Sequence, residues 1–263
     1  MMALRARNTL LAALIPLALA ACAKAESEPA QEATANAVED RPQLGLMTSL
    51  PLYWPLSADF GVFARGEAET PWQRALIERQ YEIVPLDTLS PIQGLSPDDP
   101  ETDPLAGLDR LAIVQPRGLA PSDNVALDEW VRGGGHLLLV LDPILSGHYE
   151  TAIGDPRRPV DTALIPPVLE RWGLSMRFDA DQPDQAEVAV PYSTSPYAVF
   201  GAGELTTGAG STCRIMAQGV MARCDVGQGT VTVVSDAGMF EHELQTDAKA
   251  AHPLSDLMRY AFD

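Results

Sequence analysis

Carboxylate and imidazole side chains stand at the ends of two apolar segments, at residues 136–141 and 230–236, that are typical of buried strands. Polar groups beyond the carboxyl ends of neighbouring parallel strands line the crevice in which open α/β sheets bind ligands. A carboxylate beside an imidazole could transfer protons or hold a polar solute there. The side chains concerned are Asp142, His148, Asp236, Glu241 and His242.

Aromatic and basic side chains could contact a ligand at the same edge. Tyr53, Trp54 and Phe60 follow the first predicted strand, and Arg117 follows a strand at residues 111–114. Aromatic rings beside charged groups can stack on a sugar or a peptide. The same rings could instead form a lid that only packs on the core, and both interpretations stay open. The candidate ligand-binding residues are therefore Tyr53, Trp54, Arg117, Asp142, His148, Asp236 and His242.

Known catalytic motifs are incomplete in this chain. A nucleophile elbow needs Cys or Ser on a tight turn after a strand, but Asp142 and Pro143 follow the strand at residues 136–141. Ser235 lies near a strand end without the G-x-S-x-G pattern. No H-x-x-x-H or H-E-x-x-H spacing occurs. We therefore predict no catalytic residue, no bound metal and no cofactor.

The elements that position these groups centre on one βαβ unit. An apolar run at residues 111–114 predicts a strand buried on both faces. Pro121 and Ser122 begin a helix whose apolar residues recur at helical spacing, and the glycines at residues 133–135 end it. Phosphate loops precede a helix, whereas these glycines follow one, which argues against a nucleotide site. The strand at residues 136–141 completes the unit and predicts a parallel sheet in an α/β domain.

The other predicted elements occupy one globular domain over residues 43–263. Residues 87–108 are rich in proline and aspartate and predict an exposed loop. The paired prolines Pro166 and Pro167 either begin or kink the helix that contains them. Strands are predicted at residues 43–47, 81–86, 174–178, 187–190, 197–200 and 230–236, helices at 70–80, 161–172 and 247–262, and a hairpin at 213–224.

Two cysteines flank the predicted hairpin. If Gln218 and Gly219 form a two-residue turn, Cys213 lies opposite Cys224. An exported protein can hold a disulfide bond between them. The sequence thus predicts a Cys213–Cys224 disulfide.

The N-terminal segment has the features of an export signal. Arg5 and Arg7 precede an apolar stretch at residues 10–21 that is too short to span a bilayer. The stretch ends in Leu19-Ala20-Ala21-Cys22, which resembles a bacterial lipobox. The resemblance implies a signal peptide at residues 1–21, lipidation of Cys22 and a periplasm-facing lipoprotein of the bacterial cell envelope. Residues 22–42 then form a flexible acidic tether.

The acidic balance of the chain limits its partners. The formal net charge is −18 at pH 7. A protein of this charge repels phosphate backbones, so we predict no nucleic-acid partner. A membrane contacted through the lipid on Cys22 is the partner predicted instead.

Two segments are similar to a known protein family. These are LAIVQP followed by LDEWVRGGGHLLLVLDP, and GQGTVTVVSDAGMF, which together cover about a fifth of the chain. They resemble the exported domain of gliding-motility-type ABC transporter auxiliary proteins. The resemblance implies a flavodoxin-like or glutamine amidotransferase-like three-layer sandwich with a mainly parallel sheet, to which the hairpin is added.

Three functional hypotheses follow. The leading one is a lipid-anchored, non-catalytic binding domain that accompanies an ABC permease and ATPase. An alternative is a hydrolase or sugar-modifying enzyme that uses the side chains of Asp142 and Asp236 together with His148 or His242. A further alternative is a lipoprotein that binds a small polar solute.

Overall fold

The computed structural model describes residues 41–56, 60–96, 98–183, 185–193, 196–243 and 252–263. The signal peptide, the lipidation site Cys22 and the tether up to residue 40 lie outside these residues and stay predictions. The described residues belong to one compact unit, Arg41–Asp263. No helix among them is long and apolar enough to cross a bilayer.

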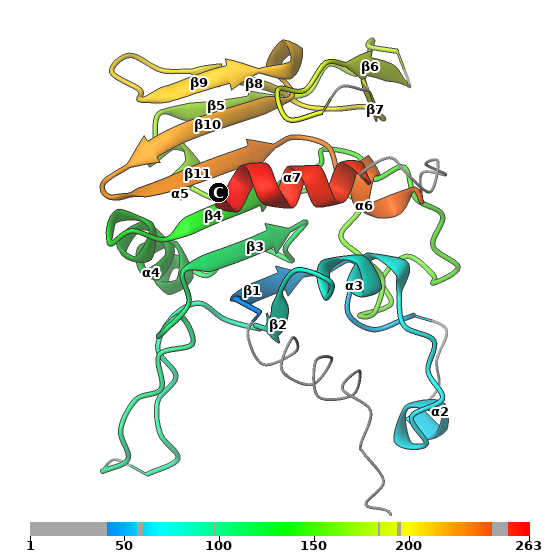
Figure 1. Ribbon diagram of the computed structural model, residues 1–263, viewed down its shortest axis with the longest axis vertical. Coiled ribbons are helices and arrows are strands. Elements are labelled where there is room, and N and C mark those ends of the chain that lie inside the picture. The colour runs from blue at the N-terminus through cyan, green and yellow to red at the C-terminus, as the bar shows by residue number, and fades with distance from the viewer. Residues whose placement is uncertain (1–40, 57–59, 97, 184, 194–195, 244–251) are drawn as a thin grey trace, which may run out of the picture. The chain divides into compact units, whose positions relative to one another are not determined.

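A seven-stranded open sheet forms the centre of this unit (Figure 1). Its strand order is β2-β1-β3-β4-β11-β10-β9. The first five strands run parallel, and β10 and β9 extend the sheet antiparallel. The prediction of an α/β domain with a mainly parallel sheet is confirmed. The strands are β1 (Gln43–Thr48), β2 (Glu82–Pro85), β3 (Arg110–Val114), β4 (His136–Val140), β9 (Cys213–Met216), β10 (Met221–Val226) and β11 (Gly229–Val234).

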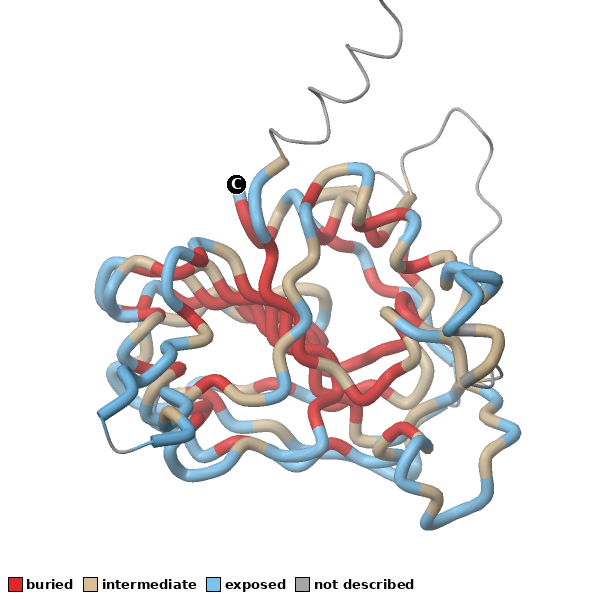
Figure 2. Tube along the Cα trace, turned by 90° about the horizontal axis from the view of Figure 1, so that it is seen from below, coloured by how far each residue is buried: buried red, intermediate tan, exposed pale blue. Residues whose placement is uncertain are grey.

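Apolar clusters cover both faces of the sheet because its central strands are apolar on both sides. Leu138 and Val140 of β4 join a cluster that includes residues of α7 (Pro253–Phe262). Leu137 and Leu139 join a second cluster with residues of α4 (Pro121–Arg132). Buried residues accordingly concentrate along the strands (Figure 2).

Short elements complete the fold. The helices α2 (Phe60–Ala64), α3 (Trp72–Ile77), α5 (Val168–Arg171) and α6 (Gly238–Glu241) each span one or two turns. Two additional two-stranded sheets pair β5 (Leu174–Arg177) with β8 (Glu204–Thr207), and β6 (Ala186–Val188) with β7 (Tyr197–Val199). Neither α2 nor β8 follows from the sequence pattern.

Prolines stand at the beginnings of two helices. Of the predicted helix at residues 161–172 only α5 forms, directly after Pro166 and Pro167, so the alternative in which these prolines begin the helix is the one that holds. A proline ring cannot occupy the interior of a helix without removing a hydrogen bond. The closing helix begins at Pro253, which takes a first-turn position. Its predicted portion at residues 247–251 lies outside the described residues.

The parallel strands end at a common level, which we call the carboxyl edge. Val114 of β3 is paired with Val140 of β4, and Val140 is paired with Val234 of β11. Residues that directly follow these strands are therefore brought together, although they are far apart in the sequence. The candidate site lies at this edge, among the loops that follow the aligned strand ends.

The predicted disulfide is present. Cys213 of β9 is paired with Cys224 of β10, and their sulfur atoms are bonded. The turn differs from the prediction: residues 217–219 form a 3-10 turn, in which Ala217 and Gln218 have positive φ values. The cysteine register is retained because the turn still places Val220 beside Ala217, whose carbonyl accepts its amide hydrogen bond.

Removing the disulfide should lower stability without unfolding the domain. The bond closes a short loop with a sequence separation of 11. A loop of this size corresponds to about 2–3 kcal/mol of unfolding free energy in the chain-entropy description. The double variant Cys213→Ser/Cys224→Ser should lose that amount in urea unfolding. A loss near zero would show that the hairpin is held by its strand pairing alone.

Candidate active site

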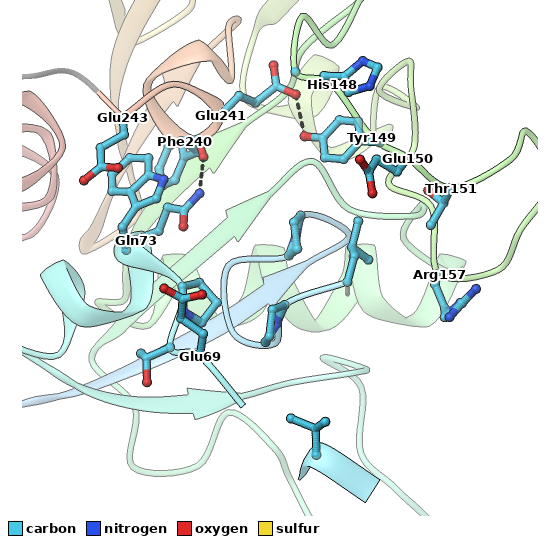
Figure 3. A pocket seen from close by; sticks show the side chains of 18 residues that line it. Glu69, Gln73, His148, Tyr149, Glu150, Thr151, Arg157, Phe240, Glu241 and Glu243 are labelled. Carbon is cyan, nitrogen blue, oxygen red and sulfur yellow. Dashed lines mark hydrogen bonds between the residues drawn. The ribbon is translucent and has the colours of Figure 1, made fainter. Parts of the chain in front are cut away.

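An open cavity of about 940 Å³ lies near the carboxyl edge. Its walls come from the loop after β1, the segment that begins α3, the loop after β4, and α6 with the residues that follow it. Figure 3 shows polar side chains around this space. Those used below are Glu69, Trp72, His148, Tyr149, Arg157 and Glu241. The volume falls within the usual range of small-molecule sites.

A hydrogen-bonded group of four side chains lies next to the cavity, and we call it the Ser146 cluster: Ser146, Tyr149, Glu241 and His242. Tyr149 and Glu241 line the cavity, whereas Ser146 and His242 are not among its lining residues. The Ser146 Oγ atom lies 2.9 Å from His242 Nε2 and 3.0 Å from Glu241 Oε2. Glu241 Oε2 also accepts the amide hydrogen of Ser146 at 2.9 Å. The Tyr149 hydroxyl donates to Glu241 Oε1 at 2.5 Å (Figure 3). The cluster thus joins a hydroxyl, an imidazole and a carboxylate.

Two neighbouring strands bring the cluster together. Ser146 and Tyr149 lie on the loop after β4, whereas Glu241 ends α6 and His242 follows it, shortly after β11. Gly147 permits the approach, because an added Cβ atom would lie 2.5 Å from Glu241 Oε1. Any other residue at this position would displace the carboxylate.

The surroundings of the cluster affect the Tyr149 hydroxyl and the His242 ring. Burial, followed by the hydrogen bond to Glu241, raises the pKa of the Tyr149 hydroxyl, so tyrosine remains the donor. The His242 ring packs against Phe200 in a tilted arrangement, with 4.5 Å between the ring centroids. Ser146 is exposed to solvent, whereas His242 is half-buried. A molecule from solvent can therefore reach the Ser146 hydroxyl, while the His242 imidazole is held in place by its contact with Phe200.

Asp142 and Asp236 are fully buried beneath the cluster. Asp142 accepts the amide hydrogens of Ile144 at 2.9 Å and Ala237 at 2.7 Å. Burial, aided by the charge of Asp236, raises the pKa of Asp142 to about 8. Burial also raises the pKa of Asp236, although three hydrogen bonds oppose it. Neither carboxylate reaches the cavity surface, so these groups organise the backbone around the site.

The remaining predicted site residues lie in separate places. His148 is exposed and lines the cavity. Tyr53 and Trp54 face Arg74, whose guanidinium carbon lies 4.1 Å and 5.4 Å from their ring centroids. Arg117 donates to the carbonyl oxygen of Arg158 at 2.9 Å. Tyr53, Trp54 and Arg117 are not among the residues that line the cavity.

Gln115 and Ser146 were missed in the sequence. Gln115 is fully buried, has a φ of 46°, and bonds both the backbone N–H and C=O of Asp142. A non-glycine residue in this strained region often marks a functional site. Ser146 carries no motif, and its partner His242 lies 96 residues away. Only proximity to a predicted strand end could have directed attention to Ser146.

The described part of the chain contains no cluster of residues that would form a metal site. No three His, Cys, Asp or Glu residues there are grouped so that they could hold a metal ion.

Comparisons with known proteins give no close relative. No family model matches the sequence, and no curated protein is similar to it at a significant level. Among solved structures, the chain is similar to an exo-beta-1,4-mannosidase from Opitutaceae bacterium strain TAV5, with 17% identity and a TM-score of 0.39 over 79% of this chain and 33% of that one. It also matches a beta-galactosidase from Rahnella sp. R3, with 11% identity and a TM-score of 0.42 over 75% and 29% of the two chains.

A cytoplasmic protein from Salmonella typhimurium matches along nearly its whole length. The identity is 12% and the TM-score is 0.41, over 84% of this chain and 98% of that one. By contrast, the chain spans about a third of the two glycosidases. Likenesses at this level say nothing about the activity of this chain.

The predicted membership of the ABC transporter auxiliary family is wrong. No family model matches the sequence, and the resemblance rests on about a fifth of the chain. The leading hypothesis, a non-catalytic accessory of a transporter, depended on that family and is therefore wrong as well. The two quoted segments reflect a βαβ arrangement, which many unrelated α/β proteins share.

Proposed function

We propose that the protein is a hydrolase in which Ser146 is the nucleophile and His242 is the general base. The observation that carries this proposal is the 2.9 Å contact between Ser146 Oγ and His242 Nε2. An exposed hydroxyl within hydrogen-bond reach of an imidazole is the arrangement that activates serine for covalent catalysis. The adjacent cavity offers room for a substrate.

The proposed chemistry is acyl transfer to water. Ser146 Oγ attacks the carbonyl carbon of an ester or amide, and its proton passes to His242 Nε2. The protonated imidazole then gives this proton to the leaving alcohol or amine as its bond to the carbonyl carbon breaks, which leaves the acyl group as an ester on Ser146. Water hydrolyses the acyl-enzyme by the reverse sequence. Glu241 Oε2, at 3.0 Å from Oγ, is the other group that could accept the proton.

A fluorophosphonate probe tests the proposal directly. Ser146 Oγ should bond to phosphorus as fluoride leaves, so intact-protein mass should rise by one adduct located on Ser146. Ser146→Ala should abolish that adduct. Ser175→Ala, at an exposed serine of β5, is the matched control and should retain it. An unlabelled wild-type protein, tested beside a serine hydrolase that reacts, would contradict the proposal.

The cavity supports a second candidate function, the binding of a polar solute. Its wall combines the Trp72 and Tyr149 rings with the Glu69 and Arg157 side chains, and such walls suit sugars and other hydroxylated molecules. A solute present at 100 times its Kd should stabilise the native protein by about 2.7 kcal/mol. Thermal-shift screening of sugars and amino acids should then reveal a ligand whose effect is lost in Trp72→Ala. A screen without any shift would argue against solute binding.

The strand order supports a finer fold assignment. We propose a flavodoxin-like arrangement, because β2-β1-β3-β4-β11 corresponds to the 2-1-3-4-5 order of that class. The order reverses between β1 and β3, where such sheets bind ligands. The residues after β1 that line the cavity, Pro51, Pro55 and Leu56, follow that point.

A further inference from the structure

Asp142 connects the two segments that carry the Ser146 cluster. Its Oδ1 atom accepts from the amide of Ile144, two residues before Ser146. Its Oδ2 atom accepts from the amide of Ala237, which directly precedes α6 and leads to His242. We propose that Asp142 is the positioning residue that sets the distance between Ser146 and His242. This inference rests on the proposed hydrolase function.

The position of Asp142 is itself fixed from the neighbouring strand. Gln115, directly after β3, accepts the amide hydrogen of Asp142 at 2.8 Å through Oε1. Its Nε2 group donates to the carbonyl oxygen of Asp142 at 3.0 Å and to that of Val160 at 2.9 Å. The backbone at Gln115 has a positive φ. The segments that follow β3, β4 and β11 are thus joined at one residue, Asp142: β3 through the Asp142 backbone, and β11 through its carboxylate.

Asp236 supplies the matching support for the imidazole. It accepts the amide hydrogens of Gly238 at 2.9 Å and Phe200 at 2.6 Å. Phe200 is the residue against which the His242 ring packs. Tyr197 donates to Asp236 and accepts from the amide of Met239, so α6 is held on this side as well. With His242 held in this way, Asp142 governs where the serine loop lies relative to it.

A purely structural role makes different predictions. If Asp142 only caps loop amides, its loss should reduce stability but leave the folded protein equally reactive. If it sets the nucleophile–base distance, the folded variant should bind the probe normally but react slowly. A displacement of about 1 Å in a reacting group can reduce the rate about 10²-fold.

The test measures acylation of Ser146 by the fluorophosphonate probe in folded variants. Asp142→Asn replaces one of the two carboxyl oxygens by an amide donor, and Asp142→Ser leaves one side-chain oxygen on a shorter side chain. Both should lower the maximal acylation rate about 10- to 100-fold with unchanged probe affinity. Amide exchange of Ile144 or Ala237 should become faster. Asp128→Asn, a buried carboxylate on α4 that contacts Arg132, Arg171 and Trp172, is the control and should keep the wild-type rate.

The outcomes separate the two proposals. Wild-type acylation rates in both folded Asp142 variants would overturn the positioning role while leaving the hydrolase proposal intact. If the wild-type protein never reacts with the fluorophosphonate probe, both the hydrolase proposal and the positioning role are wrong. In that case, faster exchange at Ile144 or Ala237 in the variants would show that Asp142 only organises the backbone.

Discussion

His242→Asn is expected to slow acylation of Ser146 about 10²- to 10⁴-fold, the usual contribution of a positioned general base. Asparagine keeps a polar side chain of similar length but cannot take up a proton. The wild-type protein should therefore react with the probe much faster than the variant. The measurement is the rate of fluorophosphonate labelling of both proteins at one pH and one temperature at which both are folded.

Matched variants assign the role of each neighbour. His136→Asn changes a histidine at the opposite end of β4, where Nδ1 contacts the Thr230 hydroxyl, and should keep the wild-type rate. Glu241→Gln tests the other possible base. If Glu241→Gln eliminates labelling and His242→Asn has no effect, the carboxylate takes the proton and the assignment of His242 is wrong.

Stability is expected to fall as the pH rises from 5 to 8. The pKa values of the buried Asp142 and Asp236 carboxyls are raised, that of Asp142 to about 8, mainly by burial. The folded state therefore holds a proton more strongly than the unfolded chain does. The stabilisation is fully present below the unfolded pKa near 4 and is lost as the pH rises through the folded pKa. The loss should be roughly 2–4 kcal/mol over this interval.

At acidic pH, the unfolding free energy should instead decrease as the pH falls. Burial alone would raise the pKa of Asp128, but hydrogen bonds from Arg132, Trp172 and Arg171 outweigh it, and the pKa is lowered. The stability that this group contributes is lost as the pH falls through its folded pKa, below about 4. The unfolding free energy should therefore be greatest near pH 5.

Urea unfolding between pH 3 and 9 checks both trends. Asp142→Asn removes one titrating group and should flatten the curve between pH 5 and 8. Asp128→Asn should keep the slope in that interval and change only the acidic side. A wild-type stability that is constant or rises from pH 5 to 8 would show that the buried pair is ionised at little cost.

Local pattern accounts for much of the fold. The apolar run that forms β4, the helix that begins at Pro121 and the glycines after it specify a βαβ unit through contacts within one short segment. The same locality explains the disulfide, since Cys213 and Cys224 are related by one hairpin. The edge at which Asp142 and Asp236 lie follows from the direction of parallel strands.

Long-range packing decided where the predicted site residues lie in the folded protein. The sequence predicts that Asp142 and Asp236 follow strands, but their carboxylates turn into the interior, where backbone amides satisfy them. Tyr53 and Trp54 lie against Arg74 because α3 begins beside their loop, which no local pattern encodes.

The Ser146 cluster shows this division most clearly. By itself, the sequence determined the α/β class, the parallel strands and the edge at which a site would form. Only the tertiary structure brought Ser146 to His242, because their distance depends on the register between β4 and β11 and on the paths of two loops. A hydrophobic period specifies which face of a strand is buried, but it carries no information about how loops from different strands meet.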